Sequence, residues 1–344
     1  MTDGFVAVAA TDAAPTFATD LLRLSEYLAT AFSADLPAAE EFALRHRDLA
    51  ARAPSASLGM WEYATAEFAL HTGRLDRAMQ MADRAARHLV WRDFTGLQAS
   101  TQALRAAVAA RLGRRSFARD LRDAIEPAQR ADIKVELHVA RVDAELALNA
   151  SHRREGAKLL VVAGRRAVAE GHAHFGVLAI DEAFMVTGTP ELAEELASHA
   201  NRSPLVDILY RRAEAQIGGD PRAVADAARE LAGIGMPGRA LQAWATAVAL
   251  EERHGSPEKA RRWRREALVV GSQERVAGWP VGRDVDALTE RELDVARLAA
   301  RRIRSREIAE RLDVSVRTVD NHLARVFRKL GVTRREDLEE ALLA

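Results

Sequence analysis

The sequence predicts an all-α protein, in which a long array of helical repeats is followed by a small domain of four helices. Strand signals are nearly absent, whereas Ala, Leu, Glu and Arg recur at three- and four-residue spacing from about residue 17 to residue 272. A short motif of small residues also recurs along this region. The 344 residues, 48% of them hydrophobic, are enough for two or three domains with a sizeable core.

The repeated motif consists of a small turn residue, an Ala five positions later and a small or apolar residue seven positions beyond. Its four clear and two weaker copies begin 30 to 40 residues apart, at Gly73, Gly113, Gly188 and Gly255 and at Ser151 and Gly218. This is the spacing of helical hairpins, in which Gly permits the turn and small residues let the helices approach closely. The positions resemble the turn and second helix of tetratricopeptide repeats, without most of their aromatic and Pro positions. An irregular bundle in an Ala-rich sequence is the alternative.

A change of composition marks the end of the array. After Val270 the chain reads GSQERVAGWPVGRDVDA, which is rich in Gly and turn residues and contains Pro280, a helix breaker. We therefore expect a flexible N-terminus at 1–16, a sensing or interaction array at 17–272, a linker at 273–285 and a compact domain at 286–344.

The first helix of the compact domain is predicted from its start signals. Thr289 and Glu292 have the spacing of a capping box, and Leu288 and Leu293 that of a hydrophobic staple. For the second helix, Ser305 is the expected N-cap. The residues expected to face inward from the second helix are Ile308, Ala309 and Leu312.

The third helix is predicted to begin after Ser315, its N-cap, and to end at Gly331, a suitable left-handed C-cap. Apolar residues at steps of three and four form one expected core stripe along it, namely Val316, Val319, Leu323, Val326 and Leu330. A further capping box at Thr333 and Glu336 predicts a last helix.

The second and third helices, joined by the three-residue turn 313–315, have the pattern of a helix-turn-helix, whose second helix lies in the major groove of DNA. The local charge agrees with this. The whole chain has 50 basic and 50 acidic residues, but residues 301–335 contain eleven basic and four acidic residues, a net charge of +7. Such a local patch predicts phosphate contacts and steep salt dependence of binding.

The stretch LTERELDVARLAARRIRSREIAERLDVSVRTVDNHLARVFRKLGVTRREDLEEA resembles the LuxR-type DNA-binding domain over about 55 residues. The shared motifs are the LTxRE opening, EIAxxL in the second helix, SxxTVxxH in the recognition helix and the KLGV ending. The preceding region resembles the C-terminal half of the large ATP-binding LuxR-type regulators. The sequence has no GxxxxGK[ST] motif, so we expect a short relative or a chain that lost the ATPase portion.

Two positions depart from the family pattern. Most members have Gly where Arg302 stands, and a left-handed residue with a side chain costs roughly 1 kcal/mol, so the turn after the first helix is expected to be strained or rearranged. Arg304 stands where the family often has the Ser that caps the second helix.

The resemblance implies which side chains of the recognition helix, 316–330, read DNA. The expected base-reading residues are Asp320, Asn321, Ala324 and Arg325. Asn321 can read adenine, Arg325 guanine, and Asp320 can accept a hydrogen bond from cytosine or repel wrong bases. The expected phosphate contacts, which position the protein without reading sequence, are Arg306, Arg317, Thr318, Lys329 and Arg334.

The sequence therefore predicts a sequence-specific transcriptional regulator that binds double-stranded DNA as a homodimer, with an unknown ligand or protein at the repeats and RNA polymerase as a further candidate partner. The family uses its last helix for dimerisation, which makes Leu338, Ala341 and Leu342 candidates for the dimer contact; packing on their own domain is the equal alternative. The other functions left open are a helical-repeat adaptor with a vestigial DNA-binding domain and a protein like sigma-factor region four.

Other classes of function find little support. The sequence has no Cys, no recognisable catalytic motif, no export signal and no membrane span, so we expect a cytoplasmic protein that is not an enzyme and needs no cofactor. His172 and His174, the one close His pair, would point apart on a helix, which argues against a metal site.

Overall fold

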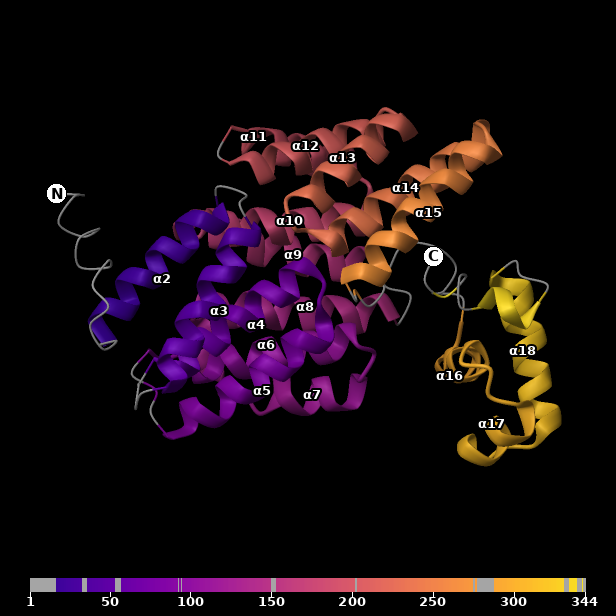
Figure 1. Cartoon of the computed structure of the whole chain (residues 1–344), viewed down its shortest axis with the longest axis horizontal. Coiled ribbons are helices and arrows are strands. Elements are labelled where there is room, and N and C mark those ends of the chain that lie inside the picture. Colours follow the sequence, from indigo (N-terminus) through magenta and orange to yellow (C-terminus); the bar gives the residue numbers. More distant parts are fainter. Residues whose placement is uncertain are drawn as a thin grey trace. The chain divides into compact units, whose positions relative to one another are not determined.

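The computed structural model confirms the all-α fold (Figure 1). It describes residues 17–32, 36–52, 57–91, 93, 95–149, 153–201, 203–274, 276, 288–330, 334–338 and 342, among which every regular element is a helix. The chain divides into two compact units, Met1–Trp279 and Pro280–Ala344. No helix in the described ranges is both long and apolar enough to cross a membrane.

The first unit is an array of helical hairpins. In chain order its helices are α2 (Phe17–Phe32), α3 (Leu36–Arg52), α4 (Leu58–Thr72), α5 (Leu75–Trp91), α6 (Gln98–Arg111), α7 (Arg115–Asp123), the short 3-10 helix η1 (Pro127–Ala131), α8 (Ile133–Asn149), α9 (Arg153–Ala169), α10 (Ala173–Thr187), α11 (Pro190–Ser198), α12 (Pro204–Ile217), α13 (Pro221–Gly233), α14 (Pro237–His254) and α15 (Pro257–Glu274). The last five helices all start with Pro, whose fixed φ and missing N–H suit the first turn.

The glycines of the repeat motif lie at the turns within these hairpins. Gly73 joins α4 to α5, Gly113 joins α6 to α7 and Gly188 joins α10 to α11, each with positive φ (89°, 75° and 62°). Gly255 joins α14 to α15 with an extended backbone. The predicted helical array is thus confirmed, and its turns lie where the motif spacing indicated.

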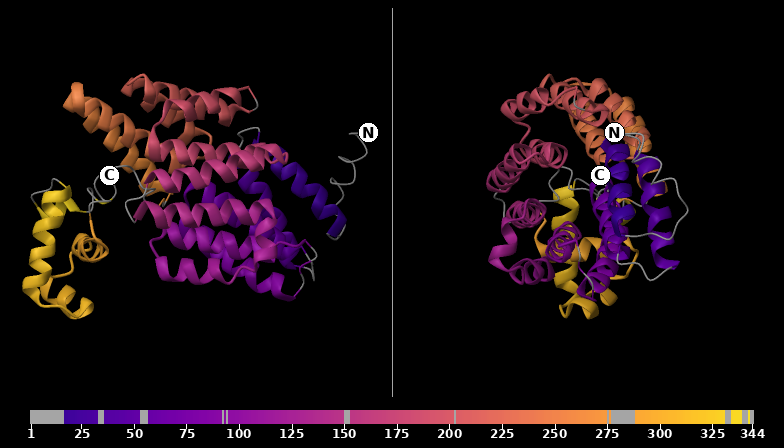
Figure 2. Two further views of the ribbon diagram at one scale, coloured as in Figure 1. Left: turned by 180° about the vertical axis from the view of Figure 1, so that it is seen from behind. Right: turned by 90° about the vertical axis from the view of Figure 1, so that its left-hand side faces the viewer.

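The array winds until its last hairpin meets an early one (Figure 2). Helix α14 contacts α4, and the two elements approach at Gly73 and Gly238. A Cβ atom added to Gly73 would lie 2.8 Å from the Cα of Gly238, so the approach requires glycine on both sides.

The even-numbered helices from α6 to α14 are linked by buried ion pairs. Asp181 of α10 is 1% exposed and accepts hydrogen bonds from Arg212 of α12 and Arg239 of α14, each 2% exposed. Burying such charges is costly, and it is offset only when they are closely paired.

Glu182, the next residue along α10, extends this network towards α6 and α8. Its carboxylate lies 2.9 Å from Arg111 of α6, 3.0 Å from Arg141 of α8 and 3.3 Å from Arg239. Arg111 also lies 3.3 Å from Glu145 of α8. The sequence does not predict this network, because single arginines in an Arg-rich chain follow no pattern.

The second unit has its own hydrophobic core. Its helices are α16 (Glu290–Ala300), α17 (Ser305–Leu312) and α18 (Val316–Leu330), followed by the 3-10 turn η3 (Arg335–Asp337). The fully buried side chains of this core, each 0% exposed, are Val295, Ala296, Ala299, Ile308, Val319, Val326 and Leu338.

Two details of the predicted helices were wrong. Helix α17 starts at Ser305 itself, with Arg304 as its N-cap and no capping side-chain hydrogen bond, since Arg offers no acceptor. Val316, the first residue of α18, is 41% exposed and does not belong to the core stripe. The predictions at Gly331 and Thr333 lie outside the described residues.

Candidate nucleic-acid interface

The predicted capping box fixes the start of α16. The Thr289 hydroxyl accepts a hydrogen bond from the Glu292 backbone N–H at 3.3 Å, and the Glu292 carboxylate accepts one from the Thr289 N–H at 2.8 Å. Glu292 is 2% exposed, so this pair also closes the buried end of the helix.

Arg302 forms the end of α16 in the left-handed conformation, with φ 61°. Its N–H donates to the carbonyl of Ala299 at 2.9 Å, and the N–H of Ile303 donates to the carbonyl of Leu298 at 3.2 Å. These two bonds are the Schellman arrangement that usually requires Gly. Arg302 therefore keeps the left-handed turn that Gly forms in most members of the family. Of the two outcomes expected here, a strained turn or a rearranged one, the turn is strained.

The turn between α17 and α18 holds the two helices of the helix-turn-helix together. Asp313 has φ 50°, a left-handed conformation that Asp tolerates better than most residues. The Ser315 hydroxyl accepts a hydrogen bond from the Thr318 N–H at 3.1 Å and lies 2.8 Å from the Thr318 hydroxyl. The predicted Ser315 cap is confirmed.

Helix α18 has one buried and one exposed face. Val319, Leu323 and Val326 point into the core, at 0%, 7% and 0% exposure. The four predicted base-reading residues, on the other side, are exposed: Asp320, Asn321, Ala324 and Arg325. The three polar ones form no hydrogen bond or ion pair with any described residue.

The predicted phosphate contacts differ in their surroundings. Arg317 and Arg334 are exposed, while Thr318 is half-buried. Arg306 is 87% exposed and lies 3.7 Å from Glu310, too loose a pair to hold it. The side chain of Lys329 lies outside the described residues.

Two arginines of this domain serve the fold instead. The Arg335 guanidinium donates to the carbonyl of Ala299 at 3.3 Å and to that of Ile303, which stabilises the end of α16. Arg291 donates to the carbonyl of Leu312 at the end of α17. Charge counting over residues 301–335 could not separate Arg335 from the exposed cations around it.

Of the candidate dimer residues, Leu338 is 0% exposed and packs in the core of its own domain. Packing on its own domain was the alternative to a dimer contact that the sequence left open. Leu342 is partly buried against the same core, and Ala341 lies outside the described residues.

His322 is half-buried, and its Nδ1 has no hydrogen-bond partner within the described ranges. No group of three or more His, Asp or Glu that could hold a metal occurs in the described part of either unit.

Comparison with known proteins identifies this domain. Residues 286–340 match the family described as bacterial regulatory proteins, luxR family. A protein of Mycobacterium bovis and two of Mycobacterium tuberculosis, strains CDC 1551 and H37Rv, are each 35% identical to this chain over 102 residues. All three are HTH-type transcriptional regulators by name.

The similar segment covers 27% of this chain and only 12% of each relative, so the chain spans about an eighth of the relatives' length. No solved structure matches the chain at a significant level. The family match agrees with the structure of this domain, which has capped helices, a three-residue turn and an exposed polar face on α18. Residues 286–340 are a helix-turn-helix domain of the luxR family of bacterial regulatory proteins.

Proposed function

We propose that the chain is a sequence-specific transcriptional regulator whose helix α18 lies in the major groove of its operator. The exposed face of α18 is the observation that carries this proposal. Its polar side chains have no partner among the described residues, while the opposite face is buried in the domain core. A helix placed in this way presents short and long polar groups to base edges without unpacking the domain.

Each base-reading side chain has a role that follows from its chemistry. Asn321 can make two hydrogen bonds to adenine, and Arg325 two to guanine. Ala324 offers a methyl group to the methyl of thymine, and Asp320 accepts from the amino group of cytosine. The phosphate contacts are Arg306, Arg317, Thr318, Lys329 and Arg334, which hold the helix in register.

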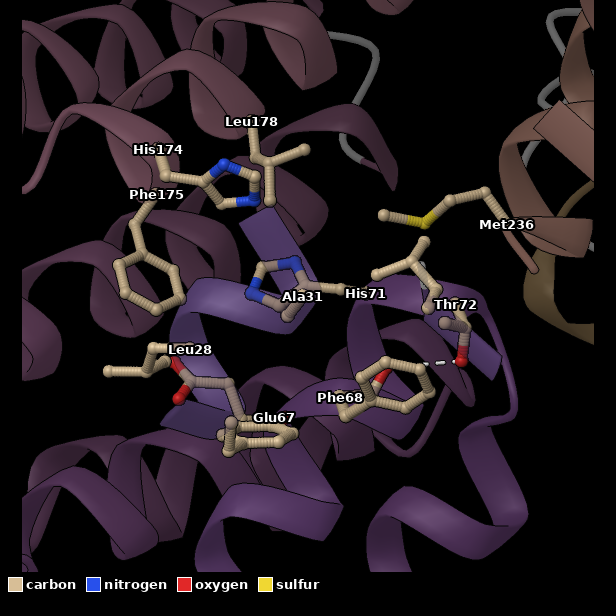
Figure 3. Close-up of a pocket in the computed structure, with 12 residues that line it drawn as sticks. Leu28, Ala31, Glu67, Phe68, His71, Thr72, His174, Phe175, Leu178 and Met236 are labelled. Carbon is tan, nitrogen blue, oxygen red and sulfur yellow. Dashed lines mark hydrogen bonds between the residues drawn. The ribbon is translucent and has the colours of Figure 1, made fainter. Parts of the chain in front are cut away.

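The regulator would act in the cytoplasm as a homodimer on an inverted repeat, with Leu342 and Ala341 on the dimer side. The helical array would sense a small ligand or a protein partner and pass its state to the DNA-binding domain or to RNA polymerase. Support for this sensing role comes from the array itself, which has a cavity (Figure 3) whose lining residue His71 lies near Arg141 and Arg239 of the buried ion-pair network.

Genome-wide mapping of bound DNA followed by gel-shift assays tests the proposal. Recovered sites should share one sequence with an inverted repeat. Asn321→Ala and Arg325→Ala should each weaken binding to that sequence by about 1–3 kcal/mol and relax selectivity at one base pair. Arg317→Ala should weaken binding to all sequences alike and make it less salt-dependent.

Arg297→Ala is the matched control, because Arg297 is exposed on α16, outside the helix-turn-helix itself. It removes the same charge and should leave selectivity unchanged. Failure to recover any preferred sequence, at any salt concentration, would refute the proposal. Regulation that persists in the Asn321→Ala, Arg325→Ala double variant would instead assign the function to the helical array.

A further inference from the structure

The last helix of the array, α15, has one buried and one exposed side. Ala260 and Trp263 are 1% and 5% exposed and belong to the core of the array, where α15 packs against α14 (Figure 1). On the other side Leu268 and Val269 are 41% and 52% exposed. The terminal helix of a repeat stack normally has a polar outer face, which keeps the stack soluble. Two neighbouring aliphatic side chains on this face therefore indicate a contact surface.

The same side of α15 carries positive charge. Residues 259–265, KARRWRR, contain five bases and no acid. Arg261 and Arg265 are both exposed and lie one helical turn apart on a single face. Leu268 and Ser272 continue that face at steps of three and four residues. One exposed stripe thus combines two cations with an aliphatic side chain, and Val269 lies beside it.

The acidic side chains of this hairpin are bound to other bases. The ion pairs are Arg264 with Glu252, Lys259 with Glu251 at 3.9 Å, and Glu266 with Arg262 at 3.1 Å and with Arg229 of α13 at 2.8 Å. Glu258, exposed in the first turn of α15, forms no ion pair with Arg261 or Arg265. Like charges one turn apart repel each other, so these two arginines cost the helix some stability, which a negative partner would offset.

We propose that this face of α15 binds an acidic amphipathic helix of a protein partner. The acidic side chains of the partner pair with Arg261 and Arg265, and its apolar side chains cover Leu268 and Val269. The partner helix lies along α15, as the next helix of the stack would. This inference rests on the sensing role proposed for the array and names the kind of partner that the array meets.

Two other occupants match this face less well. The phosphates of a nucleic acid would pair with the arginines but would leave Leu268 and Val269 in water. A second copy of this chain, related by a two-fold axis, would present the same face to itself and gather the arginines of both copies in one contact. An acidic amphipathic helix complements both the charge and the apolar surface.

Fluorescence anisotropy of labelled peptides added to the full chain tests the inference. The probe is a peptide of about 18 residues, long enough to form a helix, with Leu on one face and Glu on the other. One control peptide has Lys in place of every Glu, and another has the same composition with its Leu residues scrambled. We expect saturable binding of the acidic amphipathic peptide, about tenfold tighter than that of either control and weaker at high salt.

Removal of the two arginines tests the charged part of the face. The Arg261→Ala, Arg265→Ala double variant should weaken peptide binding about three- to tenfold, because exposed charge pairs contribute modestly. It should keep or raise the melting temperature, since it relieves a repulsion, whereas a purely structural role would lower it. The Arg84→Ala, Arg87→Ala double variant is the matched control. It removes two exposed arginines from one face of α5 and should bind the peptide like the parent chain.

Val269→Ser tests the apolar part of the face and should weaken binding of the acidic peptide roughly fivefold, because it removes aliphatic surface that the partner covers. Val162→Ser is its matched control. It makes the same change at a valine of α9 that is 66% exposed, and binding should stay unchanged.

Several results would overturn the inference. They are the absence of saturable binding of the acidic peptide, equal weakening by the double variants of α15 and α5, and equal weakening by the two Val→Ser variants. Binding of random-sequence duplex DNA that depends on Arg261 and Arg265, without peptide binding, would assign the face to nucleic acid. A dimer of the free chain that Val269→Ser dissociates in sedimentation would assign it to a second copy. Gel shifts with operator DNA and no peptide report operator binding separately, so failure at α15 does not decide that proposal.

Discussion

Replacing Arg302 by Gly should stabilise the C-terminal domain. Arg302 is exposed and has φ 61°, where a Cβ atom costs about 1–2 kcal/mol. Gly removes that cost but loses about 0.5–1 kcal/mol through the greater freedom of the unfolded chain. The expected net gain is about 0.5–1 kcal/mol relative to a residue that keeps the Cβ atom.

Arg302→Ala is the proper reference for this comparison. Both substitutions remove the same cation from the end of α16, and with it any favourable interaction with the helix dipole. The difference between the Gly and Ala variants therefore isolates the backbone conformation. The Schellman hydrogen bonds from the N–H groups of residues 302 and 303 are available to both variants.

Hydrogen exchange of the full chain, read by mass spectrometry, measures the difference locally. Tryptophan fluorescence cannot do so, because all five Trp residues lie before residue 286. In the regime where exchange follows the opening equilibrium, amides of α16 and α17 should exchange roughly two to five times more slowly in the Gly variant than in the Ala variant. Equal or faster exchange in the Gly variant would refute the idea that the left-handed turn at this position is strained.

Two further substitutions test the interface and the array. Asp320→Ala should bind DNA as well as the parent or better, but discriminate less between operators in competition gel shifts; weaker binding with unchanged preference would show that the carboxylate serves the helix and not the reading of bases. Asp181→Ala leaves Arg212 and Arg239 buried without this partner and should lower the free energy of unfolding by about 3–5 kcal/mol in urea denaturation followed by tryptophan fluorescence. Asp226→Ala, which breaks an exposed pair, should cost about 0.5 kcal/mol or less, and a similar cost for both would contradict the role given to the buried network.

Features that depend on residues close in sequence could be predicted. Thr289 and Glu292 are three residues apart, so their capping box follows from spacing alone, and Ser315 caps α18 for the same reason. Gly73 and Gly188 end helices in the left-handed conformation, which few other residues adopt. The alternation of buried and exposed residues along α18 likewise repeats every three to four positions.

Features that depend on distant residues could not be predicted. Arg335 faces the end of α16, 36 residues away, while Arg334 beside it is exposed; nothing local separates the two. Arg239 reaches Asp181 across 58 residues. His71 lies in an almost wholly buried helix whose polar residues follow no helical period, so its place at a cavity depends on how α2 and α10 pack against it.

The contact between α14 and α4 changes how stability is shared along the repeats. In an open stack each unit is coupled only to its neighbours, the terminal units fray first, and unfolding can advance inwards from either end. Gly73 contacts Gly238, so a late repeat is also coupled to an early one. The stability of each of these two repeats therefore depends on the other, although they are far apart in sequence. The repeats from α4 to α14 then form a cyclic chain of couplings without free ends, and a strain introduced in one of them is felt in both directions around the cycle.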